Sequence, residues 1–572
     1  MFILGLNDSN SAAAILKDGD LIAACREERF SRIKQADDFP VKAVDYCLKE
    51  AGIPIEDVDH IVFGWNPGHE LEPLDHSRAI RQHKELLHYV PNNLLNLIGG
   101  NKEYKRVRYI SERLFLKEAE MNIHFLPHHL CHAASAFFVS DFDSAAILTI
   151  DAYGDDITTV LSQGSNNHIE VLKSTYFPHS LGSVFAAVTQ FLGFRPNVDE
   201  WKVMGMSAYG DAIVYYQKFK NIITFNERKG VLEIDLSYFS YYLWSPRRYT
   251  DKFIEAFGPE RDYKDSLLQR HKNISAAFQK RVEEVVLELL SYLHNITGEK
   301  NLCMAGGVAM NSLMNGRIVK ESPFEDVFIQ PSSDDGGVSA GGCFYYWNQI
   351  LKQPRSFQWK HDYYGPGYSN EEIKEVLDLN LIKYEYVEEI EEKAAQLISN
   401  NQIIGWFQGR MEFGQRALGN RSILADPRDP KMKDKVNRLI KHREEFRPFA
   451  PSVLIKYVGE YFDCTKPSPF MQKVFKVLES QRHKVPAITH KDGTGRLQTV
   501  DQEANPRFWK LIDAFRQITG VPMLLNTSFN DNDEPIVVTP CHALKCFYGT
   551  GMHALIMGNY LIKKDQFETQ AI

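Results

Sequence analysis

The N-terminal stretch FILGLNDSNSAAAILKDGDLIAA, residues 2–24, decides how the first half of the chain folds. Its apolar segments 2–6 and 20–24 are typical of β-strands, and the turn formers Lys17-Asp18-Gly19-Asp20 lie between them. A second stretch, AAILTIDAYGDDITTVLSQ at residues 145–163, has the same apolar–turn–apolar pattern. The two stretches therefore predict two related halves of an α/β domain.

This duplication is similar to that of the actin-like ATPase domain, in which two related halves close over a nucleotide. The apolar stretch 61–65 predicts another strand, and the amphipathic pattern at 273–297 predicts a long helix that leads into a strand at 301–304. Residues 353–370 are rich in turn formers and aromatic side chains, which predicts an interdomain linker. Beyond it we expect a helix at 371–377 and strands at 403–407 and near 521–525, while the polar residues 76–119 are expected to form a helical insertion.

Composition restricts the class of protein. The 572 residues exceed what one hydrophobic core holds, so two or three domains are expected. The net charge of −8 leaves no basic stripe for a nucleic acid. The eight cysteines are scattered without a C-x-x-C pair, which favours reduced thiols in a cytoplasmic protein. Neither a signal peptide nor an apolar stretch long enough to span a membrane is indicated.

A dense group of arginines occupies residues 405–428, GWFQGRMEFGQRALGNRSILADPR. Guanidinium groups bind phosphate and carboxylate oxygens in a bidentate manner, and glycines let backbone N–H groups approach the same anion. In an acidic chain this pattern favours a localised anion site, with an arginine-rich surface of salt bridges as the alternative. The stretch contains Arg410, Arg416, Arg421 and Arg428, and Lys441, Arg443 and Arg447 follow closely.

The clearest metal signal is PHHLCHAASAF at residues 127–137. His128 and His132 are four residues apart and share one face of a helix, where two imidazoles can bind a transition metal. Asp151 ends an apolar strand, and Asp335 lies in a glycine-rich turn. These four residues would form a site of two nitrogens and two oxygens that suits Fe(II), Mn(II) or Zn(II). Helix-capping or core histidines are the alternative, and His129 could replace either histidine.

Two further patterns are weaker. AGGVAMN at residues 305–311 follows a predicted strand and opens a helix, so its glycines allow close approach of a phosphate or ribose. A single Gly-Gly pair also marks close helix packing. Lys34 and Lys202 stand alone in loops, where solvated surface lysines are the more common finding.

Taken together, these segments resemble the NodU/CmcH family of O-carbamoyltransferases, which includes the tobramycin carbamoyltransferase, nearly from end to end. The resemblance rests on ten motifs in order: EERFSRIK (27–34), HHLCHAASAF (128–137), LTIDAYGD (148–155), WKVMGMSAYG (201–210), AGGVAMN (305–311), SSDDGGVSAG (332–341), GWFQGRMEFGQRALGNRSILADPR (405–428), KHREEFRPFAPS (441–452), DGTGRLQTV (492–500) and LLNTSFN (524–530).

The resemblance implies two domains. Residues 1–355 would form an actin-like transfer domain of the duplicated ASKHA/Kae type, similar to the metal-bearing transferases of tRNA threonylcarbamoyladenosine synthesis. Residues 356–572 would form a YrdC-like acyl-adenylate synthase. Carbamoyl phosphate and ATP, with Mg as its counterion, would give carbamoyl-adenylate in the second domain. In the first, a hydroxyl of a small molecule such as an antibiotic, Nod factor or alkaloid toxin would take the carbamoyl group, and AMP would leave.

The resemblance also implies site residues. His128, His132, Asp151 and Asp335 match its metal ligands, with iron favoured. Arg447 precedes a proline, whose ring keeps the preceding backbone extended and so pre-orients the guanidinium. Residues implied in catalysis on the anionic substrates are Lys34, Arg416, Lys441, Arg447, Arg496, Asn526 and Ser528, and residues implied in cofactor binding are Lys202, Gly306, Gly307, Asn311 and Gly337.

One departure concerns the acceptor. Many members of the family carry a His-Asp pair after the first strand, where this chain has Ser9-Asn10. Asp8 is a candidate substitute base, and a metal-bound alkoxide would explain the change equally well. Two other readings stay open: a threonylcarbamoyl transferase acting on tRNA, which the lack of a basic stripe disfavours, and a non-enzymatic actin-like scaffold. The acceptor is not read from the sequence, and a homodimer is left open.

Overall fold

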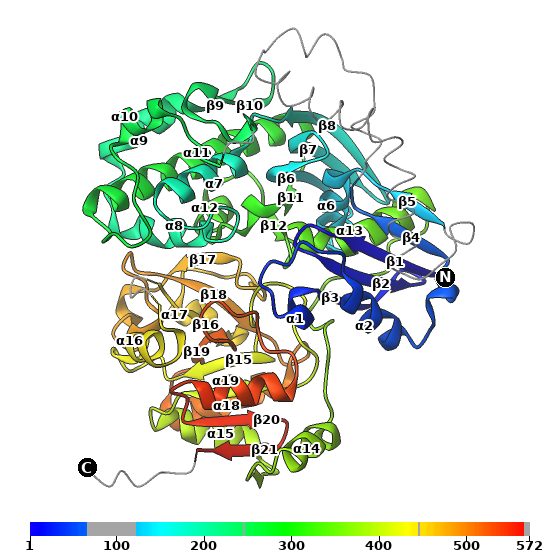
Figure 1. Cartoon of the computed structure of the whole chain (residues 1–572), viewed down its shortest axis with the longest axis vertical. Helices are drawn as coiled ribbons and strands as arrows, with labels where there is room; N and C mark the ends of the chain where they lie inside the picture. Colours follow the sequence, from blue (N-terminus) through cyan, green and yellow to red (C-terminus); the bar gives the residue numbers. More distant parts are fainter. Residues whose placement is uncertain (66–121, 244–245, 444–446, 565–572) are drawn as a thin grey trace. The chain divides into compact units, whose positions relative to one another are not determined.

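The structure, a computed structural model, describes residues 1–65, 122–243, 246–443 and 447–564. The predicted insertion 76–119 lies outside these residues. The chain divides into two compact units (Figure 1). Residues 1–27 and 35–359 form the first unit, and residues 28–34 and 360–572 form the second. The short segment 28–34 thus groups with the second unit, which the sequence did not indicate.

The first unit contains two five-stranded sheets with the same topology (Figure 1). In each sheet three antiparallel strands are followed by two strands that run parallel to the first of them. This repeat confirms the predicted duplication. One sheet has the order β3 (Asp20–Arg26), β2 (Ala12–Lys17), β1 (Phe2–Asn7), β4 (His60–Phe63), β5 (Ile123–Phe125), and the other has the order β8 (His168–Tyr176), β7 (Ile157–Ser165), β6 (Ser144–Gly154), β11 (Asn301–Ala305), β12 (Asp326–Ile329).

The N-terminal stretch holds one more strand than we expected. The turn at Lys17–Asp20 joins β2 to β3, and not the first strand to β3. The alanine-rich segment 12–17 was not predicted as a strand because alanine is a poor strand former in isolation. Here its residues pair on both sides and are buried, so tertiary packing overrides the local preference.

Helices cover the sheets of the first unit. Gly5 in β1 is required because a Cβ there would lie 2.0 Å from the carbonyl oxygen of Ser339 in the overlying helix α13. The predicted helix at 273–297 is α11, which begins four residues earlier and ends before Gly298, at φ 67°. The helices are α2 (Val41–Ala51), α6 (His128–Phe137), α7 (Leu181–Phe191), α8 (Glu200–Met206), α9 (Ile213–Ile222), α10 (Asp251–Phe257), α11 (Gln269–Thr297), α12 (Ser312–Glu321) and α13 (Val338–Phe344), and the hairpin β9 (Ile223–Asn226) and β10 (Val231–Ile234) lies among them.

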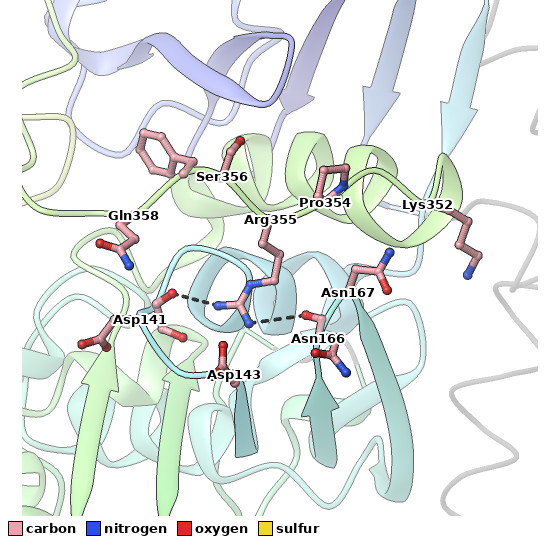
Figure 2. Close-up of a pocket in the computed structure, with 11 residues that line it drawn as sticks. Asp141, Asp143, Asn166, Asn167, Lys352, Pro354, Arg355, Ser356 and Gln358 are labelled. Atoms are coloured by element: carbon pink, nitrogen blue, oxygen red, sulfur yellow. Dashed lines mark hydrogen bonds between the residues drawn. The ribbon is translucent and has the colours of Figure 1, made fainter.

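A pocket of about 500 Å³ lies where the chain leaves the first unit (Figure 2). Arg355 extends into it and donates to the carbonyl oxygens of Phe137, Ser140 and Phe142, at 2.9, 2.8 and 2.7 Å. These bonds hold the end of the unit to the C-terminus of α6, where carbonyl oxygens lack helical partners. The pocket is thus shaped by an anchoring arginine.

The second unit is built on one nine-stranded mixed sheet (Figure 1). The helix predicted at 371–377 is α14, and the strands predicted at 403–407 and near 521–525 are β14 and β19. The strand order is β13 (Glu385–Tyr386), β21 (Tyr560–Lys563), β20 (Ala554–Met557), β14 (Ile404–Phe407), β15 (Arg421–Ala425), β19 (Met523–Ser528), β16 (Ala450–Leu454), β18 (Thr494–Val500), β17 (Lys473–Lys476). The helices are α1 (Glu28–Ser31), α14 (Asn370–Leu379), α15 (Ile390–Ser399), α16 (Met432–Val436), α17 (Val458–Tyr461), α18 (Pro506–Thr519) and α19 (Pro540–Gly549).

The segment 28–34 is bound to the second unit by arginines. Arg29 is 2% exposed and donates to the carbonyl oxygen of Gly414, at 2.9 Å, and it pairs with Glu28 at 3.0 Å. Arg32 donates to the carbonyl oxygens of Pro535 and Ile536, at 2.6 and 2.7 Å. A residue from the N-terminal end of the chain therefore supports the loop that carries Arg416.

We expect Arg29→Ala to loosen the loop 408–420 of the second unit. The substitution removes a charge-assisted hydrogen bond from a buried carbonyl oxygen, which costs roughly 1.5–3 kcal/mol. Hydrogen exchange should become faster in this loop, and the exposed Arg228→Ala should leave it unchanged. Unchanged protection of the loop in Arg29→Ala would contradict the supporting role of this arginine.

Candidate functional site

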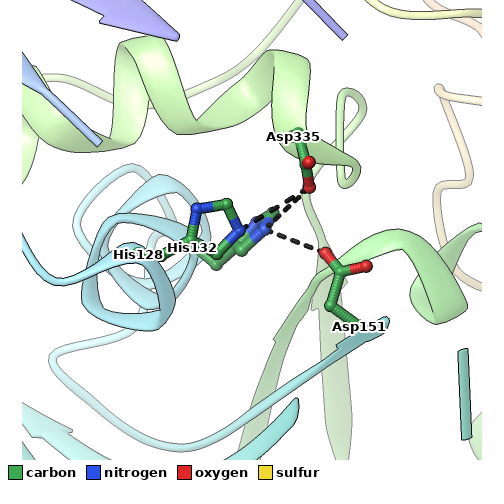
Figure 3. Close-up of side chains that lie close together, drawn as sticks. All are labelled: His128, His132, Asp151 and Asp335. Carbon is green, nitrogen blue, oxygen red and sulfur yellow. Dashed lines mark ion pairs between the residues drawn. The ribbon is translucent and has the colours of Figure 1, made fainter. Parts of the chain in front are cut away.

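A buried cluster of two histidines and two aspartates lies in the first unit (Figure 3). His128 and His132 extend from α6, and one nitrogen or oxygen from each of the four residues lies within 4.8 Å of the others. The Nε2 atom of His132 is 3.1 Å from Asp151 Oδ2 and 3.6 Å from Asp335 Oδ1, and His128 Nε2 is also 3.6 Å from Asp335 Oδ1. The structure thus brings together residues that are 207 positions apart in the chain, from 128 to 335.

Each ligand candidate is held by the backbone around it. His128 Nδ1 lies 2.9 Å from the carbonyl oxygen of Gly64, so it carries the proton and leaves the Nε2 lone pair to the cluster. Asp151 accepts from its neighbour Ala152 N at 2.6 Å and from Gly307 N at 3.1 Å. It lies where the pairing register of β6 shifts, a bulge that can re-aim a side chain. These contacts fix the direction of the donor atoms.

Asp335 is the first residue of the turn before α13. Its carboxylate is oriented by the loop that follows β1. Its Oδ2 accepts from the hydroxyl of Ser9, at 2.6 Å, and its carbonyl oxygen accepts from Asn7 Nδ2, at 2.9 Å. Ser9, which stands in the place of the histidine that the resemblance implied, therefore contacts a ligand candidate directly. Asp37 is the residue that sequence reasoning missed here: burial raises its pKa, and the charges of Asp335 and Asp8 add to that rise.

The charges of the His/Asp cluster favour a cation bound between its four side chains. Burial opposes a charge on His132, but its close contacts with the carboxylates of Asp151 and Asp335 outweigh burial and raise its pKa to about 9. Although burial opposes its charge too, His128 and His132 hold the pKa of Asp335 well below its usual value. The Nε2 atoms of both histidines are buried without a hydrogen-bond partner. Two imidazole nitrogens and two carboxylates that converge in this way suit a divalent transition metal.

His129 does not replace either histidine. Its Nδ1 lies 2.8 Å from Thr149 Oγ1, and its Nε2 lies 3.1 Å from the carbonyl oxygen of Ile157. Both ring nitrogens are therefore used outside the cluster, and burial lowers its pKa well below the usual value. The His/Asp cluster therefore contains His128 and His132 and not His129, and their role as metal ligands stays a prediction.

The residues expected to bind a cofactor take several local roles in the first unit. Gly306 adopts φ 95°, and Gly307 N donates to Asp151. Asn311 caps α12 through Met314 N, at 3.1 Å, and Lys202 pairs with Asp199, at 3.2 Å. A Cβ on Gly337 would lie 1.9 Å from Ser332 O, so this glycine permits a close turn. Gly306 and Gly307 thus border the His/Asp cluster, and nucleotide binding by these residues stays a prediction.

The second unit gathers cations around Arg496. Burial lowers the pKa of Arg496 well below its usual value, and the guanidinium groups of Arg416, Arg443 and Arg447 lower it further. Arg496 Nε is buried without a hydrogen-bond partner. Burial also lowers the pKa of Lys441, with Arg443, Arg447 and Lys34 adding to the effect. We call Lys34, Arg416, Lys441, Arg443, Arg447 and Arg496 the cation cluster.

The four arginines of residues 405–428 do not act together. Arg421 is buried and donates to the carbonyl oxygens of Gln408 and Pro366, at 2.6 and 2.9 Å, and Arg410 donates to that of Tyr364, at 2.7 Å. Arg428 pairs with Asp426, at 2.6 Å. Of these four, Arg416 alone contributes to the pKa shift of Arg496. The expected anion site is therefore drawn from several segments, and three of the arginines hold the loop in shape.

Asn526 and Ser528 lie on β19 beside this loop. Asn526 Nδ2 donates to the carbonyl oxygen of Ala417, at 3.1 Å, and to Ser452 Oγ, at 2.9 Å. Lys441 Nζ donates to the carbonyl oxygen of Ser528, at 2.6 Å, and to Asn530 Oδ1, at 2.7 Å. Lys441 therefore fastens the end of β19. Arg443, which we did not assign to the site from sequence, joins the cation cluster; its place two residues after Lys441 was the available signal.

The loop that carries Arg416 is organised by an acidic side chain. Glu412 is fully buried, and its Oε1 accepts from the backbone N–H groups of Leu418 and Asn420, at 2.7 and 2.9 Å. One carboxylate thereby closes the loop between β14 and β15, and this fixes the backbone on both sides of the arginine.

The first unit holds a His/Asp cluster with the donor set of a metal site, and the second unit holds the cation cluster. Comparison with known proteins identifies the family of the chain. The family model described as Carbamoyltransferase N-terminus matches residues 2–344, and the one described as Carbamoyltransferase C-terminus matches residues 395–564. The chain belongs to the carbamoyltransferase family, and it is a transferase enzyme of that kind.

Relatives match over most of their length. The chain is 36% identical to the nodulation protein NolNO of Sinorhizobium fredii, over 97% of this chain and 79% of that protein. It is 38% identical to a Synechocystis protein, over 98% of this chain and 96% of that protein. Among solved structures, an activator of 2-hydroxyisocaproyl-CoA dehydratase from Clostridium difficile matches at 13% identity and a TM-score of 0.33, over 62% and 96% of the two chains. In the described part of the chain, no helix is long and apolar enough to cross a membrane.

Proposed function

We propose that the protein is an ATP-dependent O-carbamoyltransferase that works in two steps. The cation cluster carries the first step. Buried cations that lower one another's pKa values destabilise the folded chain unless an anion binds between them. Carbamoyl phosphate and ATP are both polyanions and would provide that negative charge. The support is the lowered pKa of Arg496, which three neighbouring guanidinium groups reinforce.

In this proposal the second unit makes carbamoyl-adenylate. For the atoms to balance, carbamoyl phosphate loses phosphate to one water and becomes carbamate. A carbamate oxygen then attacks the α-phosphorus of ATP, and pyrophosphate leaves. Arginine forks suit the phosphate oxygens in both steps. We keep the assignment of residues 356–572 as a YrdC-like domain within this proposal, and add segment 28–34 because Lys34 influences Lys441.

The transfer step is proposed for residues 1–355. His128, His132, Asp151 and Asp335 would hold a divalent metal, with iron, manganese and zinc all compatible with the donor set. When bound, the metal supplies a Lewis acid that polarises the acyl group. Gly64 keeps His128 in the tautomer whose Nε2 faces the cluster, and Ser9 holds Asp335 with Oδ1 towards both histidines. Asp8 as the acceptor's base stays a prediction.

The acceptor is a hydroxyl of a small molecule. Similarity to a nodulation protein favours a Nod factor as one candidate, next to antibiotics and alkaloid toxins. A nucleic acid acceptor is not proposed, because the net charge of −8 provides no basic surface for tRNA. A screen of hydroxyl compounds with labelled carbamoyl phosphate would identify the acceptor.

We expect the full-length protein to release pyrophosphate from ATP only when carbamoyl phosphate is present. The reason is that carbamate oxygen is the attacking group, so ATP alone lacks a partner. Pyrophosphate and AMP would be measured with and without an acceptor, and inorganic phosphate would replace carbamoyl phosphate in the control. Pyrophosphate release that ignores carbamoyl phosphate would contradict the adenylate step.

A further inference from the structure

A second group of metal-ligating side chains lies in the first unit, apart from the His/Asp cluster. His60 is the first residue of β4, His124 lies in β5, and Tyr346 belongs to a π-helix at Tyr345–Ile350. His60 Nδ1 is 3.2 Å from His124 Nε2. The hydroxyl oxygen of Tyr346 is 3.3 Å from His60 Nδ1 and 3.0 Å from His124 Nε2. Three donor atoms from three elements therefore form a small triangle.

Hydrogen bonding uses only two of the three contacts of this triangle. A ring nitrogen offers either one N–H or one lone pair, and a tyrosine hydroxyl offers one proton. If His124 Nε2 accepts from Tyr346, it has no proton to give to His60. If it donates to His60, it cannot accept from Tyr346. When His124 Nε2–H donates to the hydroxyl oxygen of Tyr346 and that hydroxyl donates to His60 Nδ1, every atom has a partner, and the contact of 3.2 Å between the two ring nitrogens has no hydrogen bond of its own.

One cation would use all three atoms. Zinc binds imidazole nitrogen and oxygen ligands at about 2.0–2.2 Å in a tetrahedron, whose ligand atoms then lie about 3.3 Å apart. The observed separations of 3.0, 3.2 and 3.3 Å are close to the edges of one face of such a tetrahedron. The fourth position is left to water. π-Helical turns in proteins often occur at functional sites.

We propose that His60, His124 and Tyr346 form a second, structural metal site that takes Zn²⁺ and fastens β4, β5 and the π-helix together. Both histidine rings are half-buried and Tyr346 is 5% exposed, so a cation could enter from the side of the rings. Among the residues that the structure describes, β5 is an edge strand of three residues that pairs with β4 alone, so such a link would hold it in place.

The charges nearby are compatible with zinc. Burial lowers the pKa of His60, against the charge of Asp59, and burial together with His60 lowers that of His124. Both shifts favour the neutral imidazole, which is the form that binds metals. Burial raises the pKa of Tyr346, so its oxygen is the weakest of the three ligands. Loss of a histidine should accordingly cost more affinity than loss of the tyrosine oxygen.

The test counts zinc in the full chain after treatment with a chelator. His132→Ala breaks the His/Asp cluster and provides the background. We expect this variant to keep one Zn²⁺ per chain, and His132→Ala with His124→Ala to keep none. When Tyr346→Phe replaces His124→Ala in the double variant, the ring is preserved and only the hydroxyl is lost. Zinc binding should then weaken roughly 10–100-fold, the range seen when a supporting contact of a metal site is lost. His168→Ala, an exposed histidine, is the matched control and should keep the zinc.

A thermal melt provides a readout independent of activity. Zinc that binds only the folded chain raises the melting temperature, so the rise should appear in His132→Ala and vanish when His124→Ala is added. If His132→Ala does not fold, zinc binding is measured on Tyr346→Phe made in the wild-type chain. Of the two zinc sites in that chain, one must then bind more weakly. No zinc in His132→Ala, or zinc binding unchanged by both His124→Ala and Tyr346→Phe, would overturn the proposal.

Discussion

His132→Ala should abolish carbamoyl transfer while adenylate synthesis continues. Among the described residues of the His/Asp cluster, only His132 has a ring nitrogen close to both carboxylates, at 3.1 Å from Asp151 and 3.6 Å from Asp335. Its loss therefore removes the central ligand of the cluster. A bound metal supplies several kcal/mol of transition-state stabilisation, so we expect transfer to fall roughly 10³-fold or more. The cation cluster lies in the other unit, and the first step should stay within about twofold of wild type.

Metal content, pyrophosphate release and acceptor carbamoylation would be measured on one preparation. His129→Gln is the matched control, because His129 lies on the same helix and bonds to Thr149 and Ile157 outside the cluster. It should keep both the metal and the transfer. Loss of pyrophosphate release in His132→Ala would show that the cluster serves the first step, and intact transfer would show that the histidine pair is only helix packing.

Arg447→Lys should slow adenylate formation by about one to two decades. Lysine keeps the charge but loses the planar fork that binds two phosphate oxygens at once. One charge-assisted hydrogen bond to a buried anion is worth roughly 1.5–3 kcal/mol. Arg447 precedes Pro448, and its charge lowers the pKa of both Arg496 and Lys441, so it belongs to the cation cluster.

The matched control for that substitution is Arg428→Lys, because Arg428 lies in the same unit and pairs with Asp426 instead. Pyrophosphate release would be followed at several concentrations of ATP and carbamoyl phosphate. A loss confined to one substrate would assign Arg447 to that substrate. Wild-type kinetics in Arg447→Lys would place this arginine outside the anion site.

Several features of the site were predictable because they depend on local periodicity. A spacing of four put His128 and His132 on one face of a helix, and α6 has them there. Asp335 was expected in a glycine-rich turn and opens the short helix Asp335–Gly337, whereas Asp151, expected at the end of an apolar strand, lies inside β6, where the pairing register shifts between Ile150 and Gly154. The repeated strand pattern at 2–24 and 145–163 gave the duplication, although the strand at Ala12–Lys17 was missed. Its alanines form a strand only because partners flank them on both sides.

Other features could not be predicted from spacing. Segment 28–34 groups with the second unit because its arginines donate to carbonyl oxygens there. Arg29 and Gly414 are more than 380 residues apart in the chain, and Arg32 and Ile536 are more than 500 apart. The arginines of 405–428 look alike in sequence, yet Arg421 donates to carbonyl oxygens, whereas the charge of Arg416 lowers the pKa of Arg496. Which partner a long, flexible side chain meets depends on the packing around it, and no local pattern encodes that.

The sequence by itself determined the family, the duplicated α/β architecture and the identity of the four residues of the His/Asp cluster, because strand, helix and turn preferences act over a few residues. Only the tertiary structure decided that Ser9 orients Asp335, that His129 turns away, and that His60, His124 and Tyr346 meet. These contacts depend on the order of strands in a sheet and on where helices pack, and both are settled when distant segments bury their apolar faces together.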